Sequence, residues 1–311
     1  MSPLVIAAVL VTQTCGALAP ILTKLALAGL PPWTMVTTRQ LVGVPLLFAL
    51  ARMGQRSAPV ARVPFDRRDW ALVLTLSWAG FALPQLLLAV GIARSTGTNG
   101  ALLSPLEPIG ILIGGALFFR ERLTSWRLAA VALGTVGALC IVLQGGVRPG
   151  LGDPLGDALI AAGHLAWAIY TLAAKPLLER HDPGRVSLAA VVLSIPPLAL
   201  LASTETIDPA RALAGLGWVV ALAFTATALG TYTWNWALRS ISAGTMAAFI
   251  FIQPLVGLAA GHLALGEPVG PLALAGAFLI LVGVTLEARR TAAEPPTAAA
   301  DAVRSSTRLP S

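Results

Sequence analysis

The chain has 311 residues, of which 56% are hydrophobic and only 11% are charged. Its mean hydropathy of +0.80 excludes an ordinary soluble globular domain and predicts a polytopic membrane protein. A net charge of +7 would suggest a nucleic-acid partner for a soluble protein. In a membrane protein basic residues report topology instead, so we expect no nucleic-acid partner.

Ten apolar windows are long enough to cross a bilayer, which takes about 20 residues. In chain order they are 4–27, 33–51, 70–93, 97–119, 126–146, 155–174, 186–203, 214–238, 242–265 and 270–288. No basic segment precedes the first window, so we expect a retained helix rather than a cleaved signal peptide. The sequence therefore predicts an all-α membrane protein with ten transmembrane helices. Residues 291–311 lack periodicity and predict a disordered tail.

The basic residues distribute unevenly between the connections. If the N-terminus is cytoplasmic, three arginines lie outside, namely Arg94, Arg148 and Arg211. Fourteen basic residues then lie inside: Arg52, Arg56, Arg62, Arg67, Arg68, Arg120, Arg122, Arg127, Lys175, Arg180, Arg185, Arg239, Arg289 and Arg290. This asymmetry predicts a multi-pass protein of the cytoplasmic membrane with both termini in the cytoplasm.

One block of the sequence occurs twice at an offset of 146 residues. Pro108, Glu121 and Gly137 recur as Pro254, Glu267 and Gly283, with identical spacings of 13 and 16 residues. Five apolar spans separate the copies, and this odd number gives them opposite orientations in the membrane. The pattern is typical of inverted repeats in secondary transporters. We expect two five-helix repeats, 1–147 and 155–290.

The sequence resembles the drug/metabolite transporter superfamily, specifically its ten-helix members with two EamA domains. The matching segments are 96–101 through Pro108 to Glu121, 242–245 through Pro254 to Glu267, the residues Lys24 and Arg39, and the run 166–170. The likeness covers residues 4 to 288, but Cys15-Gly16 and Glu107 depart from the common pattern. The resemblance implies ten helices around a central cavity and transport of small organic metabolites or drugs, often as export.

The first two spans carry polar residues at membrane depth. Gln13, Gly16, Pro20 and Lys24 share one helical face, which we interpret as the interior face of span one. Lys24 lies about one turn from the outer end and Arg39 about two turns inside span two. They could form a positive outer vestibule that attracts carboxylates. The alternative is that both side chains snorkel to the lipid headgroups.

Glu107 lies near the centre of span four, where a charged side chain costs about 2.5–3.5 kcal/mol. Helical spacing places it on one face with Ser104, Gly110 and Gly114, a stripe that suits close helix packing. Pro108 frees the carbonyl of Ser104 and favours a kink. Glu107 is therefore either a titratable group that carries a proton or binds a cationic amine, or a protonated carboxyl that locks helix packing.

Span six places His164, Trp167 and Thr171 on one face. An imidazole, an indole and a hydroxyl together are typical of a wall that binds an aromatic or cationic ligand. The alternative is an aromatic side chain at the membrane interface, and Tyr170 suits that position better because it lies closer to the cytoplasmic end.

Further candidates for substrate binding lie in three other spans. Gln85 is in span three, and Tyr232 and Asn235 are in span eight. Gln253, in span nine, takes the repeat-equivalent place of Glu107. We expect the pseudo-twofold relation to bring a carboxyl and an amide to opposite walls of one cavity.

The signature residues of the repeat have a structural interpretation. Glu121 and Glu267 fall just beyond the ends of spans four and nine, where a carboxylate is favoured near a helix N-terminus and organises a tight turn. Pro108 and Pro254 interrupt spans, which suits a protein that bends as it changes access.

These features favour a secondary transporter working by alternating access, with a small-molecule substrate, a lipid environment and protons as a coupling ion. We expect neither a cofactor nor a metal, and both a monomer and a homodimer are compatible with the sequence. The alternative is a membrane-embedded enzyme acting on lipid-linked substrates. Its nearest dyad, His181-Asp182, consists of adjacent residues and is typical of a loop. A scaffolding subunit is a third option.

Overall fold

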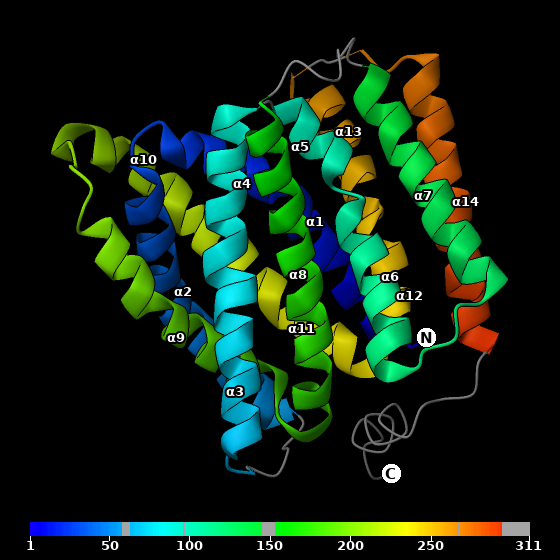
Figure 1. Cartoon of the computed structure of the whole chain (residues 1–311), viewed down its shortest axis with the longest axis horizontal. Coiled ribbons are helices and arrows are strands. Elements are labelled where there is room, and N and C mark those ends of the chain that lie inside the picture. The colour runs from blue at the N-terminus through cyan, green and yellow to red at the C-terminus, as the bar shows by residue number, and fades with distance from the viewer. Residues whose placement is uncertain (58–62, 96, 145–152, 266–267, 294–311) are drawn as a thin grey trace. The chain divides into compact units, whose positions relative to one another are not determined.

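The structure, a computed structural model, describes residues 1–57, 63–95, 97–144, 153–265 and 268–293, and the secondary structure in these ranges is helical. Figure 1 shows its elements. They are α1 (Pro3–Leu27), α2 (Pro32–Ser57), α3 (Arg67–Leu76), η1 (Ser77–Ala82), α4 (Leu83–Arg94), α5 (Gly97–Leu103), α6 (Leu106–Phe119), α7 (Ser125–Gln144), α8 (Pro154–Arg180), α9 (Pro183–Ala202), α10 (Pro209–Leu222), η2 (Ala223–Gly230), α11 (Thr231–Ser240), α12 (Ala243–Ile250), α13 (Ile252–Leu265) and α14 (Pro271–Ala293).

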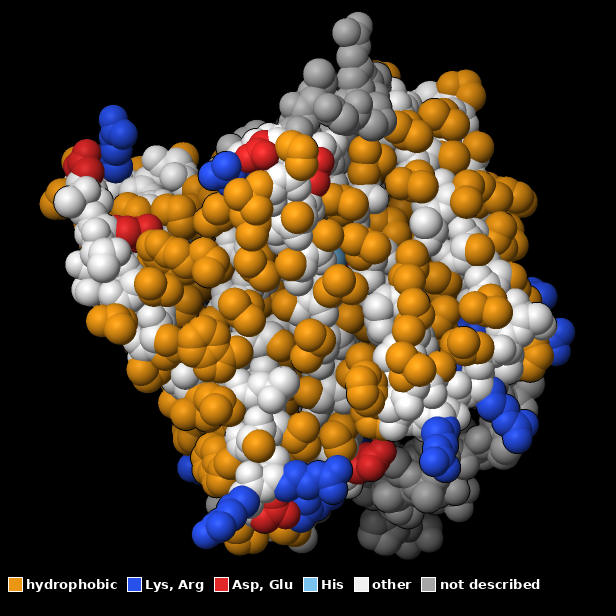
Figure 2. All heavy atoms as spheres, viewed as in Figure 1, with side chains coloured by type: hydrophobic (Ala, Val, Ile, Leu, Met, Phe, Trp, Pro, Cys, Tyr) orange, Lys and Arg blue, Asp and Glu red, His pale blue; other side chains and the backbone are white. Residues whose placement is uncertain are grey.

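Ten helical stretches in the described chain are long and apolar enough to cross a membrane, as predicted. They are Pro3–Leu27, Pro32–Gly54, Arg67–Leu88, Asn99–Phe119, Ser125–Gln144, Pro154–Arg180, Pro183–Ala202, Pro209–Ser240, Ala243–Ala260 and Pro271–Thr291. Figure 2 shows hydrophobic side chains along the visible helices and charged side chains gathered near helix ends. We number these stretches as spans one to ten.

Spans seven and eight begin earlier than the apolar windows predict. Asp182 accepts a hydrogen bond from the backbone N–H of Arg185 at 3.0 Å, and Asp208 accepts one from Ala210 at 3.0 Å. In both cases proline follows the capping aspartate. An aspartate N-cap followed by proline is a strong helix start, so each helix gains residues that hydropathy alone assigns to the connection.

The chain forms two compact units, and each takes helices from both sequence repeats. Within the described ranges, unit 1 contains residues 1–2, 87–172 and 241–293, and unit 2 contains residues 3–86 and 173–240. α4 and α8 each contribute to both units. A repeat in the sequence is therefore not a compact body in the fold.

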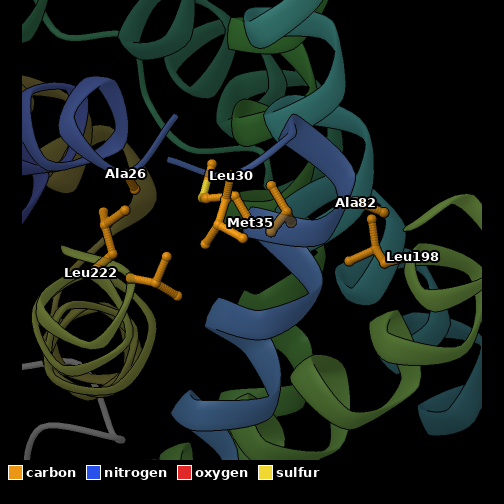
Figure 3. Packing of buried hydrophobic residues seen from close by; sticks show 8 residues of the cluster. Ala26, Leu30, Met35, Ala82, Leu198 and Leu222 are labelled. Atoms are coloured by element: carbon orange, nitrogen blue, oxygen red, sulfur yellow. The ribbon is translucent and has the colours of Figure 1, made fainter. Parts of the chain in front are cut away.

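Unit 2 is built on the pairing of α2 with α9 and of α1 with α10 and α11. Its hydrophobic core joins α1, α2, α9 and α10 to η1, and Figure 3 shows side chains of this core. The core residues are Ala26, Leu30, Met35, Val36, Ala82, Leu198, Val219 and Leu222. The two irregular segments η1 and η2 are π-helices at repeat-equivalent positions, since Ser77 and Ala223 are 146 residues apart.

Unit 1 is built on the pairing of α7 with α14, which run side by side in Figure 1. A Cβ atom added to Gly137 would lie 2.5 Å from the carbonyl oxygen of Gly276, and one added to Gly283 would lie 2.8 Å from that of Ala130. Gly283 and Gly276 are the repeat equivalents of Gly137 and Ala130. Such reciprocal contacts are expected of inverted repeats, and only small residues allow the backbones to approach this closely.

A buried ion pair and the hydrogen bonds around it join the ends of four spans in unit 1. The Arg127 Nε atom lies 3.2 Å from the Glu287 Oε1 atom, with side chains 6% and 0% exposed. Thr245 donates to the same Glu287 oxygen at 2.9 Å. Glu121 accepts hydrogen bonds from the backbone N–H groups of Ala243 and Gly244, at 3.1 and 3.0 Å.

The position of Glu121 corrects one detail of the sequence interpretation. This carboxylate does lie at a helix N-terminus, but it caps α12, whose first residue Ala243 is 122 residues away, rather than the following helix α7. Arg120 ends α6 in the left-handed region, with a φ of 54°, and the chain then turns so that Glu121 meets the second repeat. Its equivalent Glu267 lies outside the described residues.

The close crossing of α7 and α14 predicts a specific cost for a methyl group. We expect Gly137→Ala to lower the free energy of unfolding by about 1–3 kcal/mol, because the new Cβ meets a backbone carbonyl that cannot move aside. Gly257→Ala is the matched control, since no heavy atom lies within 4 Å of its added Cβ. Helix propensity should make that variant more stable, by up to about 1 kcal/mol. Unfolding in mixed detergent micelles measures both, and equal stabilities would contradict the packing described.

The ion pair predicts non-additive effects. We expect Arg127→Met and Glu287→Met each to destabilise the protein by about 3–5 kcal/mol, because either change leaves a buried charge without its partner. The double variant should be more stable than either single variant, since it removes both charges. Free energies of unfolding for the four proteins test this through a double-mutant cycle. Additive losses would show that the two side chains act independently.

Candidate functional site

Span four is interrupted directly before Glu107. α5 ends at Leu103 and α6 begins at Leu106, so Glu107 lies in the first turn of a new helix. Pro108 has no N–H for the carbonyl of Ser104, which instead accepts the N–H of Glu107 at 3.2 Å. The N-terminal end of a helix dipole favours a negative charge. The break therefore places a carboxylate inside a span at a position suited to its ionised form.

Span nine is interrupted at the equivalent place. α12 ends at Ile250 and α13 begins at Ile252, and the intervening Phe251 is 146 residues after Pro105. Gln253 lies in the first turn of α13, as Glu107 does in α6. Discontinuous helices of this kind form substrate and ion sites in many secondary transporters. The placement of the carboxyl and the amide on opposite walls of one cavity stays a prediction.

Glu107 faces His164 of α8 within unit 1. The Glu107 Oε2 atom lies 3.9 Å from the His164 Nδ1 atom, and the side chains are 17% and 13% exposed. This distance is too long for a hydrogen bond, yet the pair attracts electrostatically when the imidazole is protonated. The His164 Nδ1 atom is buried and makes no hydrogen bond in the described structure. The two polar side chains thus lie close together inside unit 1.

The glycine stripe explains why these side chains meet. A Cβ added to Gly110 would lie 3.0 Å from the Ala168 Cβ, and one added to Gly114 would lie 2.1 Å from Leu172. Both contacts are with α8, so the face that carries Gly110 and Gly114 is the face that packs on α8. Glu107, one turn earlier on this face, reaches His164. The helical periodicity of the sequence predicts this face.

The aromatic residues of α8 require one correction. Trp167 and Tyr170 contact each other edge to face, with ring centroids 5.6 Å apart. Tyr170 is only 2% exposed and is among the largest fully buried side chains, so the interfacial alternative considered for Tyr170 does not hold. Thr171 is also buried. Trp167 is partly exposed and lies one turn from His164, which leaves it available to line the same site.

Unit 2 contains a second polar cluster, centred on Arg39 of α2. The Arg39 Nε atom donates to the Thr227 hydroxyl of η2 at 2.7 Å, and Nη1 donates to the Gln85 side-chain oxygen at 3.3 Å. Arg39 is only 4% exposed. Its guanidinium is therefore buried among helices rather than exposed at an outer vestibule, and its role in attracting carboxylates stays a prediction. The side chain of Lys24 lies outside the described part of the structure.

One polar residue of α1 and one of α2 bind carbonyls of the π-helices. Thr12 donates to the carbonyl of Gly230 at 2.9 Å, and Gln40 donates to that of Phe81 at 3.5 Å. A π-helix leaves some backbone carbonyls without their regular helical partners. Here, side chains from neighbouring helices donate hydrogen bonds to such carbonyls. Gln13, beside Thr12, is fully buried. Of the interior face proposed for span one, Gln13 is buried but Pro20 is exposed, so that face stays a prediction.

Two predicted binding residues of span eight take part in packing within unit 2. Asn235 is buried and donates to the Ser187 hydroxyl of α9 at 2.8 Å. A Cβ added to Gly54 of α2 would lie within 2.0 Å of the Tyr232 hydroxyl oxygen, so Tyr232 packs against Gly54. Both residues join α11 to its neighbours, and a role in substrate binding stays a prediction for each.

A third cluster, absent from the sequence predictions, lies where span three begins. His181 Nε2 is 2.8 Å from Asp69 Oδ2, and both side chains are buried. Arg180 donates to Asp66 and Asp69 at 3.1 and 2.8 Å. The backbone N–H of Asp69 and the Arg180 guanidinium hold the pKa of Asp66 below its usual range. Asp182, predicted as part of a loop dyad, caps α9 instead.

Known proteins resemble this chain over most of its length. The pattern of the EamA-like transporter family matches residues 3–143 and 154–288. The chain is 28% identical over 285 residues to an Archaeoglobus fulgidus protein named "Uncharacterized transporter", covering 90% of this chain and 96% of that one. It is 29% identical over 290 residues to a Salmonella typhimurium protein named "Probable amino-acid metabolite efflux pump", covering 86% and 91%.

A solved structure described as "Crystal structure of protein" shares the fold, with a TM-score of 0.71 and 18% sequence identity. The match covers 93% of this chain and 96% of that chain. With the two family matches together extending over most of the sequence, the resemblance noted from its motifs is confirmed. The chain belongs to the EamA-like transporter family.

Proposed function

We propose that this protein exports small organic metabolites such as amino acids, or cationic drugs, from the cytoplasm across the cell membrane. Export proceeds by alternating access and is coupled to protons through Glu107. The observation that carries the proposal is the Glu107–His164 pair, with 3.9 Å between carboxylate and imidazole at an interrupted span. The name of the Salmonella relative, an amino-acid metabolite efflux pump, supports export and the substrate class.

The Glu107 carboxylate can exchange a proton for the ammonium group of a substrate. When Glu107 is ionised, its carboxylate can bind the ammonium group of an amino acid or a cationic drug. When it is protonated, the attraction is lost and the substrate leaves. His164, whose Nδ1 atom lies 3.9 Å from the Glu107 carboxylate, is a second polar group at the same site. An inward proton gradient can then drive substrate outward.

The two sequence repeats, 1–147 and 155–290, are the elements that change access in this proposal, and residues 291–311 form a cytoplasmic tail. Four spans carry the irregularities that such motion uses: π-helices in spans three and eight, and breaks in spans four and nine. Irregular backbone at membrane depth is tolerated where it lines a protein interior. Its occurrence at repeat-equivalent positions supports symmetrical movement.

An enzyme acting on lipid-linked substrates is the less favoured function. The histidine–aspartate pair that such an enzyme could use is His181–Asp69, and both side chains are almost fully buried. Asp69 is also engaged by Arg180. Membership of a transporter family also favours transport over catalysis.

Proteoliposome flux tests the coupling role of Glu107. We expect a panel of the common amino acids and ethidium to reveal at least one substrate that a pH gradient drives. Glu107→Gln should lose gradient-driven flux because the amide carries no titratable proton, and Glu107→Asp should retain part of it. Glu179→Gln, a change at an exposed glutamate of α8, is the matched control and should behave as wild type. Gradient-driven flux of wild-type magnitude in Glu107→Gln would sink the proposed coupling.

The proposed orientation has its own test. Because basic residues concentrate in the connections assigned to the cytoplasm, we expect a fluorescent protein fused to the C-terminus to be bright and alkaline phosphatase fused there to be inactive. Fusions truncated after Ser203, between spans seven and eight, should show the reverse. A phosphatase-active C-terminal fusion would overturn the topology.

A further inference from the structure

Arg39 is a buried cation at membrane depth without a buried anion beside it. It lies seven residues after Pro32, roughly 10 Å along the helix at 1.5 Å per residue, and its side chain is 4% exposed. Its two hydrogen-bond partners, the Thr227 hydroxyl and the Gln85 amide oxygen, are both neutral. Among the described residues, no carboxylate forms an ion pair with it.

The other buried arginine shows what full compensation involves. Arg127 is 5% exposed, yet it lies 3.2 Å from the buried carboxylate of Glu287 and 3.9 Å from that of Glu121. Even exposed arginines such as Arg94 and Arg211 have an aspartate partner. A charged side chain inside the membrane is costly, and one without an internal counter-ion marks a functional site by default.

The neighbours of Arg39 hold its guanidinium in place but do not use all of its hydrogen-bond donors. Gly43, one turn along α2, lets η2 come close, since a Cβ there would lie 2.6 Å from a Thr227 methyl carbon. The bonds to Thr227 and Gln85 use two of the five N–H donors of a guanidinium. The remaining donors form a fork whose geometry matches a carboxylate.

From this arrangement we propose that Arg39 binds the carboxylate of the transported substrate. The inference rests on the proposed transport function and deepens it by naming the substrate class: amphoteric organic acids, such as amino acids, rather than purely cationic drugs. The substrate supplies the missing anion only while it is bound. Because Thr227 belongs to η2 and Gln85 follows η1 by three residues, binding also acts on both π-helical segments at once.

Paired ligands with and without a carboxylate test the site directly. The probes are L-leucine, L-threonine and L-phenylalanine, each compared with its own amide, on the full-length protein purified in detergent. Thermal unfolding at increasing probe concentration gives an apparent Kd, because a ligand that binds the folded state raises the melting temperature. We expect at least one acid to stabilise the wild type and its amide not to do so.

Variants then assign the preference to Arg39. Arg39→Gln should raise the apparent Kd for the acid by about 10- to 100-fold, the range expected when a charge-assisted hydrogen bond is lost. Arg39→Lys retains the charge but not the planar fork of donors, so its apparent Kd for the acid should lie between those of the wild type and Arg39→Gln. This second variant keeps the test decisive if Arg39→Gln folds poorly. Arg211→Gln removes an exposed arginine of the same unit and should match the wild type.

Three results would overturn the carboxylate site and leave transport standing. The first is equal stabilisation by acids and amides, and the second is proton-driven flux of ethidium with no binding of any acid. A wild-type apparent Kd for the acid in Arg39→Gln would overturn it as well. The absence of flux for every amino acid and for ethidium would instead count against the proposed function itself.

Discussion

Inside a bilayer every peptide N–H and C=O must find a partner within the protein, and this constraint governs where the chain can depart from a regular helix. In the described residues, π-helical segments and helix breaks occur in four spans, and the structure supplies partners for several of their carbonyls. Thr12 and Gln40 donate to carbonyls of the π-helices, and the Ser104 carbonyl freed by Pro108 accepts the N–H of Glu107. Irregular backbone in the spans therefore occurs together with the polar groups that form hydrogen bonds to it.

The same constraint separates scaffold from site. Arg127, Glu121 and Glu287 satisfy one another and the first N–H groups of α12, so their charges are compensated within the protein. Arg39, Glu107 and His164 are less completely satisfied, since the arginine has only neutral partners and the carboxylate and imidazole are 3.9 Å apart. Groups whose requirements are met by the fold hold it together, and groups whose requirements are partly unmet are suited to a ligand or a proton.

Much of this architecture could be predicted from the sequence. Hydropathy indicates all ten spans, the 146-residue offset indicates the repeat, and helical periodicity places Glu107 on the glycine face that meets α8. The long-range pairs could not be predicted, because Arg39 and Thr227 are 188 residues apart and Arg127 and Glu287 are 160 apart. No local pattern links such residues. The burial of Tyr170 likewise does not follow from the local sequence pattern of α8.

The mixing of both sequence repeats in each compact unit has a consequence for biosynthesis. α2 pairs with α9 and α7 with α14, so helices of the first half enter the membrane before their partners are made. Thr227 follows Arg39 by 188 residues, and at about 5–20 residues per second the ribosome needs roughly 10–40 s to supply it. For that interval the insertion machinery, nearby lipid headgroups or water must solvate the guanidinium. During synthesis, Arg39, on which ligand binding is proposed to depend, is thus a charge in the membrane that still lacks its partner Thr227.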